Sequence, residues 1–445
     1  MADKLLIRMF DVGLGDCIYC RIPKAHVEGR DFHILIDCGT LSSTDNLSTA
    51  IENLKPLLPV IKGKRHIDLL VVTHEHKDHM TGFGMKLWDD LSFGAIWMSA
   101  AMDPKHPEAE KAKKLHTFAA GAMAEALRLN LALGPELTEL ANAMALNDDA
   151  MKTLRDTLPK ASQIKPTYVH ADSSKSELKL PLNGASISVL GPERDIDFYY
   201  LGNEGDPSLR HALGLIEAGL PSVSSAVPDA TVVATPTNLN PADFRQLRSR
   251  MLSTALAFAD LDGKVCNNTS VVLLLEWKGK RLLFVGDAEW DGGFKKGKAN
   301  SSWNVMWNLH KERLKGALAF LKIGHHGSVN ATPWGQTTAA SNGEPLAILN
   351  AILPPASKAK AKAIVSTNRG NFATIPSTDF LAEIGNRVSN TKSYDAAFKR
   401  AGLKTSNVPK FGEFERASFA KPQPLRTDLE RMLGSKGFID AEIDS

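Results

Sequence analysis

Residues 74–79 read His-Glu-His-Lys-Asp-His and directly follow the largely apolar run at 67–72. In an extended segment alternate side chains share a face, so His74 and His76 can both point at one metal ion. A sharp turn after them would aim the next aspartate and histidine at a second position nearby. Imidazole and carboxylate ligands suit zinc, manganese or iron rather than calcium. This segment therefore predicts a metal centre at the end of a buried strand.

Further strand-and-turn patterns lie on both sides of this hexapeptide. Each is an apolar run that ends in a glycine turn, an acid or histidines, at 9–16, 34–39, 281–287 and 321–328. In these stretches and in the hexapeptide the sequence resembles the metallo-β-lactamase superfamily, whose signature is this hexapeptide after a strand. The resemblance implies an α/β fold, the αββα sandwich of that superfamily, here with helical insertions.

Several short motifs point to one branch of the superfamily. They lie at 10–16, 189–192, 267–270, 286–289 and 325–328. Together they are similar to the metallo-hydrolase domain of ComEC-type DNA-uptake proteins and their soluble relatives. The stretch 364–377 also resembles that branch, with one departure. Ile375 stands where the branch often has a histidine before the proline.

The chain is longer than one such domain usually needs, so we expect insertions. Strong helix formers occupy 108–127, further helical runs lie at 135–158 and 243–258, and prolines with small residues cluster at 221–241. The predicted division is a core at 1–100 and 178–385, a helical insertion at 101–177, a second insertion at 193–264 and a peripheral C-terminal segment at 386–445. Such insertions can form lids over a cleft, and they are the expected surface for any protein partner.

The predicted metal ligands follow from charge and from the resemblance. We expect His74 and His76 to bind one ion, and Asp78 and His79 to bind the second. Asp287 is expected to bridge both, because a carboxylate has two oxygens and supplies negative charge between two dications.

The two histidines of the 325–328 motif receive different expected roles. Matching the first histidine of the motif to the late ligand of the superfamily assigns His325 to the second ion. His326 is then left to contact substrate or to make a supporting hydrogen bond, so the predicted catalytic residues are Asp78, Asp287 and His326.

One usual ligand is missing. Many superfamily members have a histidine in the loop before the strand that ends at Asp287, whereas this chain has Asn267 and Asn268 there. Asparagine is a weak ligand, and Asn268 can instead cap the turn. A loosely held first ion makes manganese as suitable as zinc, so the predicted cofactor is two divalent ions, zinc or manganese.

Three further residues are expected around the ions. Asp37 is predicted to orient a metal-binding imidazole, and Lys322 could stabilise the leaving oxygen of the substrate. Ser328, in the histidine motif, is expected close to the substrate.

The expected reaction is hydrolysis at a dinuclear centre with a bridging hydroxide. The branch resemblance favours a phosphodiesterase or nuclease that acts on nucleic acid or nucleotides. Two alternatives stay open, namely a hydrolase of another ester, lactone or amide, and a metal-containing interaction or regulatory module. Basic residues near the predicted substrate edge agree with the first reading, although the lysines could equally form an exposed face: Lys358, Lys360, Lys362 and Arg369.

Composition restricts the possible function of the protein less than the motifs do. A formal net charge of +3 neither demands nor excludes a polyanionic partner. The four cysteines are too scattered for a disulfide framework, and we expect Cys17 and Cys20 to be buried thiols. The sequence has no uninterrupted apolar run of about 18 residues and no basic, cleavable leader pattern. The expectation is a cytoplasmic protein without a membrane span.

Overall fold

The computed structural model describes residues 3–129, 131, 140–141, 143–144, 147–195, 206–217, 240–295, 300–334, 343–355, 360–372, 374–404 and 413–445. Within these residues the fold is mixed α/β, built on two mixed sheets, in agreement with the predicted class. The expected proline-rich stretch at 221–241 lies almost wholly outside the described residues, as do Lys358 and the start of the helical run at 135–158.

The first sheet comprises eight strands among the described residues, in the order β14-β1-β2-β3-β5-β6-β7, with β4 paired to β5. Its antiparallel half joins β14, β1, β2 and β3, and its parallel half joins β3, β5, β6 and β7. The strand bounds are β1 Lys4–Phe10, β2 Ile18–Ile22, β3 Phe32–Ile36, β4 Val60–Ile61, β5 Lys64–Val72, β6 Leu91–Ser99, β7 Thr167–Val169 and β14 Phe438–Asp444.

The second sheet has six strands among the described residues, in the order β13-β12-β11-β10-β9-β8. Strands β8, β9 and β10 are antiparallel neighbours, and β10 to β13 run parallel. The bounds are β8 Ala185–Gly191, β9 Val272–Trp277, β10 Lys280–Phe284, β11 Phe320–Lys322, β12 Lys362–Val365 and β13 Leu425–Arg426. Parallel strands end at the same edge of a sheet, which matters for the site described below.

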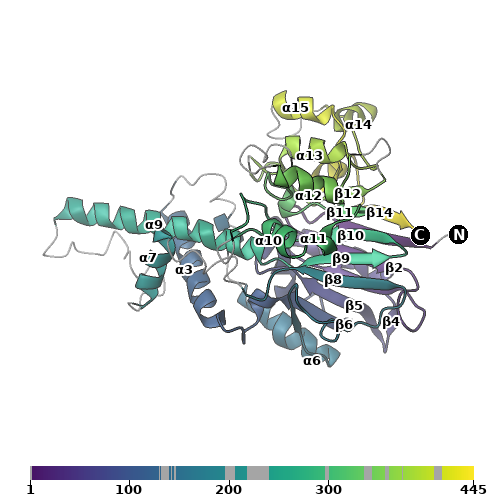
Figure 1. The fold of residues 1–445 in the computed structure, drawn as a ribbon, viewed down its shortest axis with the longest axis horizontal. Helices are drawn as coiled ribbons and strands as arrows, with labels where there is room; N and C mark the ends of the chain where they lie inside the picture. The colour runs from purple at the N-terminus through teal and green to yellow at the C-terminus, as the bar shows by residue number, and fades with distance from the viewer. Residues whose placement is uncertain are drawn as a thin grey trace.

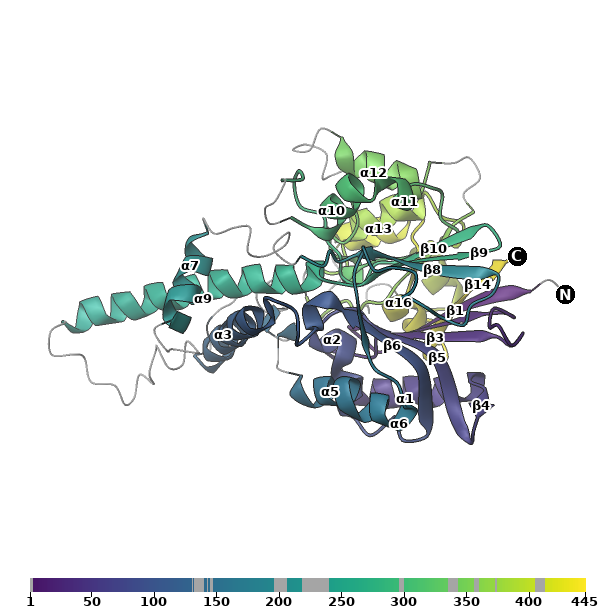
Figure 2. The same ribbon diagram turned by 60° about the horizontal axis from the view of Figure 1, so that its bottom comes forward.

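The two sheets pack face to face, with helices on both outer faces. One apolar cluster joins the inner faces of the two sheets, for example Ile34 and Leu69 of the first and Leu273 and Phe284 of the second. Figure 2 shows helices below the first sheet and above the second. The first group is α1 Thr44–Leu54, α5 Asp148–Lys152 and α6 Leu158–Ser162, and the second is α10 Ser302–Leu309, α11 Lys311–Leu314, α12 Glu344–Ile352 and α13 Thr378–Gly385.

A helical arm extends from one end of the molecule, opposite the chain termini (Figure 1). It consists of α3 Ala109–Arg128, α7 Pro207–Glu217 and α9 Pro241–Asn268. Apolar residues of all three helices form one cluster, in which the rings of Phe118 and Phe258 lie 6.0 Å apart. The last residues of α9 return from the arm to the core, so the arm is directly connected to the region of the predicted site.

Two predicted boundaries are wrong. Residues 148–169, expected to belong to a helical insertion, provide α5, α6 and β7, and they pack on or join the first sheet. The C-terminal segment, expected to be peripheral, supplies the edge strand of each sheet: β14 pairs with β1, and β13 pairs with β12. The remaining helices are α2 Lys77–Met80, α14 Tyr394–Arg400, α15 Glu413–Phe419 and α16 Thr427–Met432. Among the described residues, no helix combines the length and apolarity that a membrane crossing requires.

An ion pair between half-buried His116 and buried Asp262 ties α3 to α9 and makes the stability of the arm dependent on pH. His116 Nδ1 lies 2.8 Å from Asp262 Oδ2. Burial opposes protonation, but the charge and the hydrogen bond of Asp262 outweigh it and raise the pKa of His116 to about 9. Because this folded-state pKa lies above the unfolded value, the pair stabilises fully below about pH 6.5 and the stabilisation is lost as pH rises through 9.

We therefore expect His116→Gln to lower the free energy of unfolding by about 2 kcal/mol at pH 6, after a discount for partial exposure of the imidazole. At pH 10 the wild type and the variant should differ little. Chemical denaturation at both pH values measures the difference. An equal loss at the two pH values would show that the imidazole stabilises by packing rather than by charge.

Candidate metal centre

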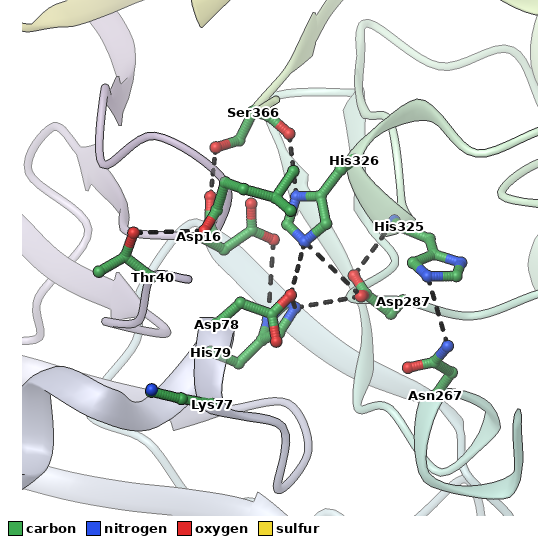
Figure 3. A network of polar contacts seen from close by, with 12 residues as sticks. Asp16, Thr40, Lys77, Asp78, His79, Asn267, Asp287, His325, His326 and Ser366 are labelled. Atoms are coloured by element: carbon green, nitrogen blue, oxygen red, sulfur yellow. Dashed lines mark hydrogen bonds and ion pairs between the residues drawn. The ribbon is translucent and has the colours of Figure 1, made fainter. Parts of the chain in front are cut away.

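Strand ends from both sheets converge on one buried group of side chains. The hexapeptide follows β5 of the first sheet, and Asp287, the 325–326 histidines and Ser366 follow β10, β11 and β12 of the second. Strands β10, β11 and β12 are parallel, so their carboxyl ends lie at one edge. Figure 3 shows Asp78, His79, Asp287 and His326 pointing toward one another, with the His325 ring turned toward Asn267.

The backbone turns at these strand ends are tight. A Cβ on Gly39 would lie 2.3 Å from His79 N, so glycine is needed where the end of β3 meets the start of α2. Asp37, His325 and His326 have φ values of 56°, 41° and 50°, in the left-handed region that non-glycine residues rarely adopt. Such conformations recur at functional sites, where the surrounding structure holds them.

Four of these residues form the centre of the group: Asp78, His79, Asp287 and His326. Each offers one nitrogen or oxygen atom, and these atoms lie within 4.8 Å of one another. His79 Nε2 is 3.2 Å from Asp287 Oδ2, and His326 Nε2 is 2.8 Å from Asp78 Oδ2 and 3.9 Å from Asp287 Oδ2. All four side chains are buried.

His74 and His76 complete the imidazole group. The ring of His74 lies 4.8 Å from that of His76 and 4.2 Å from that of His79, measured between centroids. The Nε2 atoms of all three histidines are buried without a hydrogen-bond partner, and so is Asp78 Oδ1. Leaving several buried polar atoms unpaired in one place is costly, and each such group needs an explanation.

The outer ring nitrogens are fixed by oxygen atoms. His79 Nδ1 lies 2.8 Å from Asp37 Oδ2, and Asp37 in turn accepts hydrogen bonds from the backbone and hydroxyl of Thr73. His326 Nδ1 lies 3.0 Å from the carbonyl of Ser366. When Nδ1–H donates outward, Nε2 carries the lone pair that faces the group, which is the tautomer of a metal-binding imidazole. Asp37 is therefore placed as the sequence predicted, against a histidine of the hexapeptide.

Charge is concentrated strongly in this group. Burial opposes ionisation of Asp287, but the charges of His79 and His326 outweigh it and hold its pKa well below the usual range. Burial also disfavours the charged form of His79, yet the Asp287, Asp78 and Asp37 carboxylates raise its pKa well above the ordinary value. Burial lowers the pKa of His76 to about 4 and that of His74 well below its usual value. The neutral imidazoles of His74 and His76 and the ionised carboxylates are in the forms that bind metal, whereas His79 would have to release a proton on binding.

The structure places the two adjacent histidines differently from the prediction. His326, expected to contact substrate, lies in the four-residue group, whereas His325, expected to be a ligand, is not part of it. The His325 ring lies on the cleft side, with Nδ1 3.0 Å from Glu289 Oε1 and Nε2 3.5 Å from Asn267 Nδ2. The cause is the backbone, because left-handed conformations at both residues turn the second imidazole inward.

The two asparagines end α9 and do not lie in a loop. Asn267 Nδ2 donates to Glu289 Oε1 at 2.9 Å, and its Oδ1 is buried without a hydrogen-bond partner. Asn268 Oδ1 accepts from the backbone of Glu289 and Ser302, and its Nδ2 donates to the carbonyl of Lys264, so it ties three segments together. Asn268 therefore has a structural role, and both asparagines line the cleft described below.

Lys322 is not placed to stabilise the leaving oxygen of a substrate, the role expected for it. Its side chain is fully buried, forms an ion pair with Asp16 and donates to the carbonyl of Gly286 at 3.4 Å. Burial lowers the stability of its charged form, but the charges of Asp16, Asp287 and Asp37 raise its pKa above the ordinary value. A lysine engaged in this way does not reach a leaving group in the cleft.

Asp16 and Glu289 belong to the site but were not predicted as site residues. Both sit in motifs that carried the resemblance, at 10–16 and 286–289, and both are buried acids. The signal was present, since an acid directly after a glycine turn or within a Gly-Asp-Ala-Glu run is unusual for a buried strand end.

A cleft of about 410 Å³ opens onto the group, which is a size typical of small-molecule sites. Its walls include the predicted residues His76, Asp78, Asn267, Asn268, Asp287, His325 and Ser328. Ser328 Oγ donates to Asn330 Oδ1. Ile375 also lines the cleft, at the position where the related branch often has a histidine.

Of the basic residues expected beside the substrate, Lys358 lies outside the described residues, and Lys362 and Arg369 do not line the cleft. Lys362 begins β12, whereas the site follows the other end of that strand at Ser366, roughly 13 Å away at the usual rise per residue. The Lys362 ammonium donates to the carbonyl of Glu442. Arg369 donates to the carbonyl of Pro376 and pairs with Glu415. Lys362 joins β12 to β14 of the first sheet, and Arg369 joins the segment after β12 to α15, so neither supports a basic substrate edge.

The donor set fits divalent metal ions. The unpaired inward nitrogens and carboxylate oxygens are those that zinc and manganese accept, and the fixed outer nitrogens match the hydrogen bonding usual around metal-binding histidines. No protein-family model matches the chain, and a search of curated proteins finds no similar one.

Proposed function

We propose that the protein is a metal-dependent hydrolase whose centre is formed by His74, His76, Asp78, His79, Asp287 and His326. The observation that carries the proposal is the set of buried atoms that have no hydrogen-bond partner, namely the Nε2 atoms of His74 and His76 and Asp78 Oδ1, beside the His79–Asp287 pair. A purely structural site usually has four ligands that close it. This group offers more ligands than that and borders an open cleft, which favours catalysis over a structural role.

The chemistry of such a centre is hydrolysis. Two divalent ions would supply hydroxide near neutral pH and neutralise charge that develops on the scissile group. The residues of this chain have separate tasks. Asp37 holds His79 in one tautomer, and the Ser366 carbonyl does the same for His326. The buried position of the group limits access of water to the side that faces the cleft.

We also infer that the fold is the αββα sandwich of the metallo-β-lactamase superfamily. The layers run helices, sheet, sheet and helices, and the hexapeptide lies at the sheet edge where the strand ends meet. That layer order is what the sequence resemblance implies. The helical arm of α3, α7 and α9 would be an insertion into this fold.

The bond we propose is a phosphodiester, on a nucleotide or nucleic acid. The sequence resemblance supports this choice, and the cleft volume of about 410 Å³ accommodates a nucleotide-sized group. Incubation of zinc- or manganese-loaded protein with single- and double-stranded DNA, RNA and bis-p-nitrophenyl phosphate tests it. Cleavage of the small phosphodiester is expected, and cleavage of neither the polymers nor the reporter would contradict the assignment.

A hydrolase of a small ester or lactone is the second candidate. The observation that favours it is the pair of carboxylates, Glu289 and Asp291, that lie in the cleft wall in addition to the Asp260–Lys264 ion pair. Acidic walls repel a second phosphate near the reacting one. The same metal-loaded protein should be assayed with lactone and carboxylic ester substrates, and faster turnover of these than of the phosphodiester would favour this candidate.

Variants of two lysine pairs can distinguish a polymer substrate from a small one. Lys264 and Lys295 line the cleft, whereas Lys360 and Lys362 lie at the far end of β12. If nucleic acid binds, Lys264→Gln with Lys295→Gln should weaken binding and reduce its salt dependence, because phosphate contacts release counterions. Lys360→Gln with Lys362→Gln should change neither. A salt titration of binding compares the two double variants. A larger effect of the second pair would mean that the polymer binds at the start of β12, away from the cleft, and would contradict the proposal.

A further inference from the structure

A buried lysine and a buried aspartate lie beside the proposed metal centre, and neither lines the cleft. Lys322 is the last residue of β11, and Asp16 lies in the loop between β1 and β2. The Lys322 ammonium pairs with Asp16 Oδ2. Neither side chain has any exposed surface, so this pair joins the two sheets inside the protein.

The pair contacts the proposed ligands from behind. Asp16 Oδ2 is 3.8 Å from His79 Nδ1, and the Asp16 backbone donates to the carbonyl of Asp78 at 2.9 Å. Lys322 donates to the carbonyl of Gly286, which immediately precedes Asp287. The ion pair therefore contacts His79 and also the backbone at or next to two other proposed ligands, Asp78 and Asp287.

The charges of Lys322 and Asp16 also affect the binding of cations at the site. Asp16, Asp37 and His79 bring ligand atoms within 4.8 Å of one another, so this second acidic group could itself attract a cation. The Lys322 ammonium supplies that cation. A positive charge beside the ligands would, however, repel divalent ions strongly in a low-dielectric interior, unless a nearby negative charge cancels it.

We propose that Asp16 is a positioning residue that cancels the charge of Lys322 beside the metal centre, so that the ligands can bind divalent ions. The inference rests on the proposed metal-dependent function. Asp16 does not touch the substrate, and its effect on the ions passes through Lys322.

Affinity for cobalt(II), a spectroscopic probe for such sites, tests the inference. Asp16→Asn leaves the lysine charge uncancelled, and we expect it to weaken cobalt binding at least about tenfold, the usual size of effects from groups behind metal ligands. Lys322→Met combined with Asp16→Asn removes both charges, so it should bind cobalt more tightly than Asp16→Asn alone. The cobalt absorption spectrum of the double variant should match that of the wild type.

A matched control lies in the middle of β5, outside the proposed ligand group. Asp68 is a buried aspartate that pairs with Arg30, 2.6 Å away, and Asp68→Asn should leave cobalt affinity unchanged. If the Asp16–Lys322 pair only stabilises the fold, Asp16→Asn should resemble this control. Its thermal stability would then be lower and its cobalt affinity unchanged, and that result overturns the inference.

The remaining outcomes are also decisive. A double variant that binds cobalt no more tightly than Asp16→Asn overturns the charge argument. If Asp16→Asn does not fold, the double variant decides alone: affinity within tenfold of wild type supports the inference, and a larger loss overturns it. A wild-type protein that binds no cobalt refutes the proposed function itself, which separates the two failures.

Discussion

Replacing Asp287 by asparagine is expected to reduce hydrolysis by at least about a hundredfold while the protein stays folded. The carboxylate lies between His79 and His326 and also accepts a hydrogen bond from the backbone of His325. An amide keeps the volume but removes the negative charge, so two dications would repel each other with less compensation. Turnover of bis-p-nitrophenyl phosphate and circular dichroism of the variant give the two readouts.

Asp291 provides the control for this substitution. It also lines the cleft but lies outside the four-residue group, so Asp291→Asn should retain most of the activity. If Asp287→Asn turned over the reporter as fast as Asp291→Asn, Asp287 would be an ordinary strand-end residue.

The two adjacent histidines should behave differently when each is replaced by alanine. His326→Ala removes an inward Nε2 from the group, so we expect it to lose about one bound ion per chain and to lose hydrolysis. His325→Ala should retain both ions, because its ring faces the cleft beside Glu289 and Asn267. Elemental analysis of the two purified variants after metal loading measures the difference. The opposite result would restore the order expected from the sequence match.

Part of the buried His/Asp group could be predicted from the sequence because that part is local. The hexapeptide supplies four of the side chains at one strand end, and period-two geometry is enough to bring His74 and His76 together. That inference needs no knowledge of how distant segments pack. The place of Asp287 near these residues was expected from the family resemblance, and the structure brings it to 3.2 Å from His79.

The order of His325 and His326 could not be read in the same way. Which of two consecutive side chains points inward depends on backbone dihedrals, and here both residues adopt left-handed conformations that the sequence does not announce. The role expected for Lys322 could not be judged from the sequence for a related reason. A lysine is normally exposed, and its burial became evident only when the opposite sheet brought Asp16 against it.

The boundaries of the fold depend on long-range pairing. Strand β14 pairs with β1 across almost the whole chain length, and β7 joins the first sheet after a helical segment. Alternation in short strands is a weak signal, and partner choice is decided by packing in the assembled sheet. The long helix α9 also continued to Asn268, past the predicted end at 258, because its final turn packs against the Glu289 and Ser302 segments.

The number of ions bound by the wild-type chain tests the central claim most directly. The protein should be stripped with a chelator, loaded with zinc or manganese, freed of excess metal and analysed for metal and protein together. The arrangement of His74, His76, Asp78, His79, Asp287 and His326 predicts two ions per chain. One ion would contradict a dinuclear centre, and a chain that binds none would contradict the metal centre altogether.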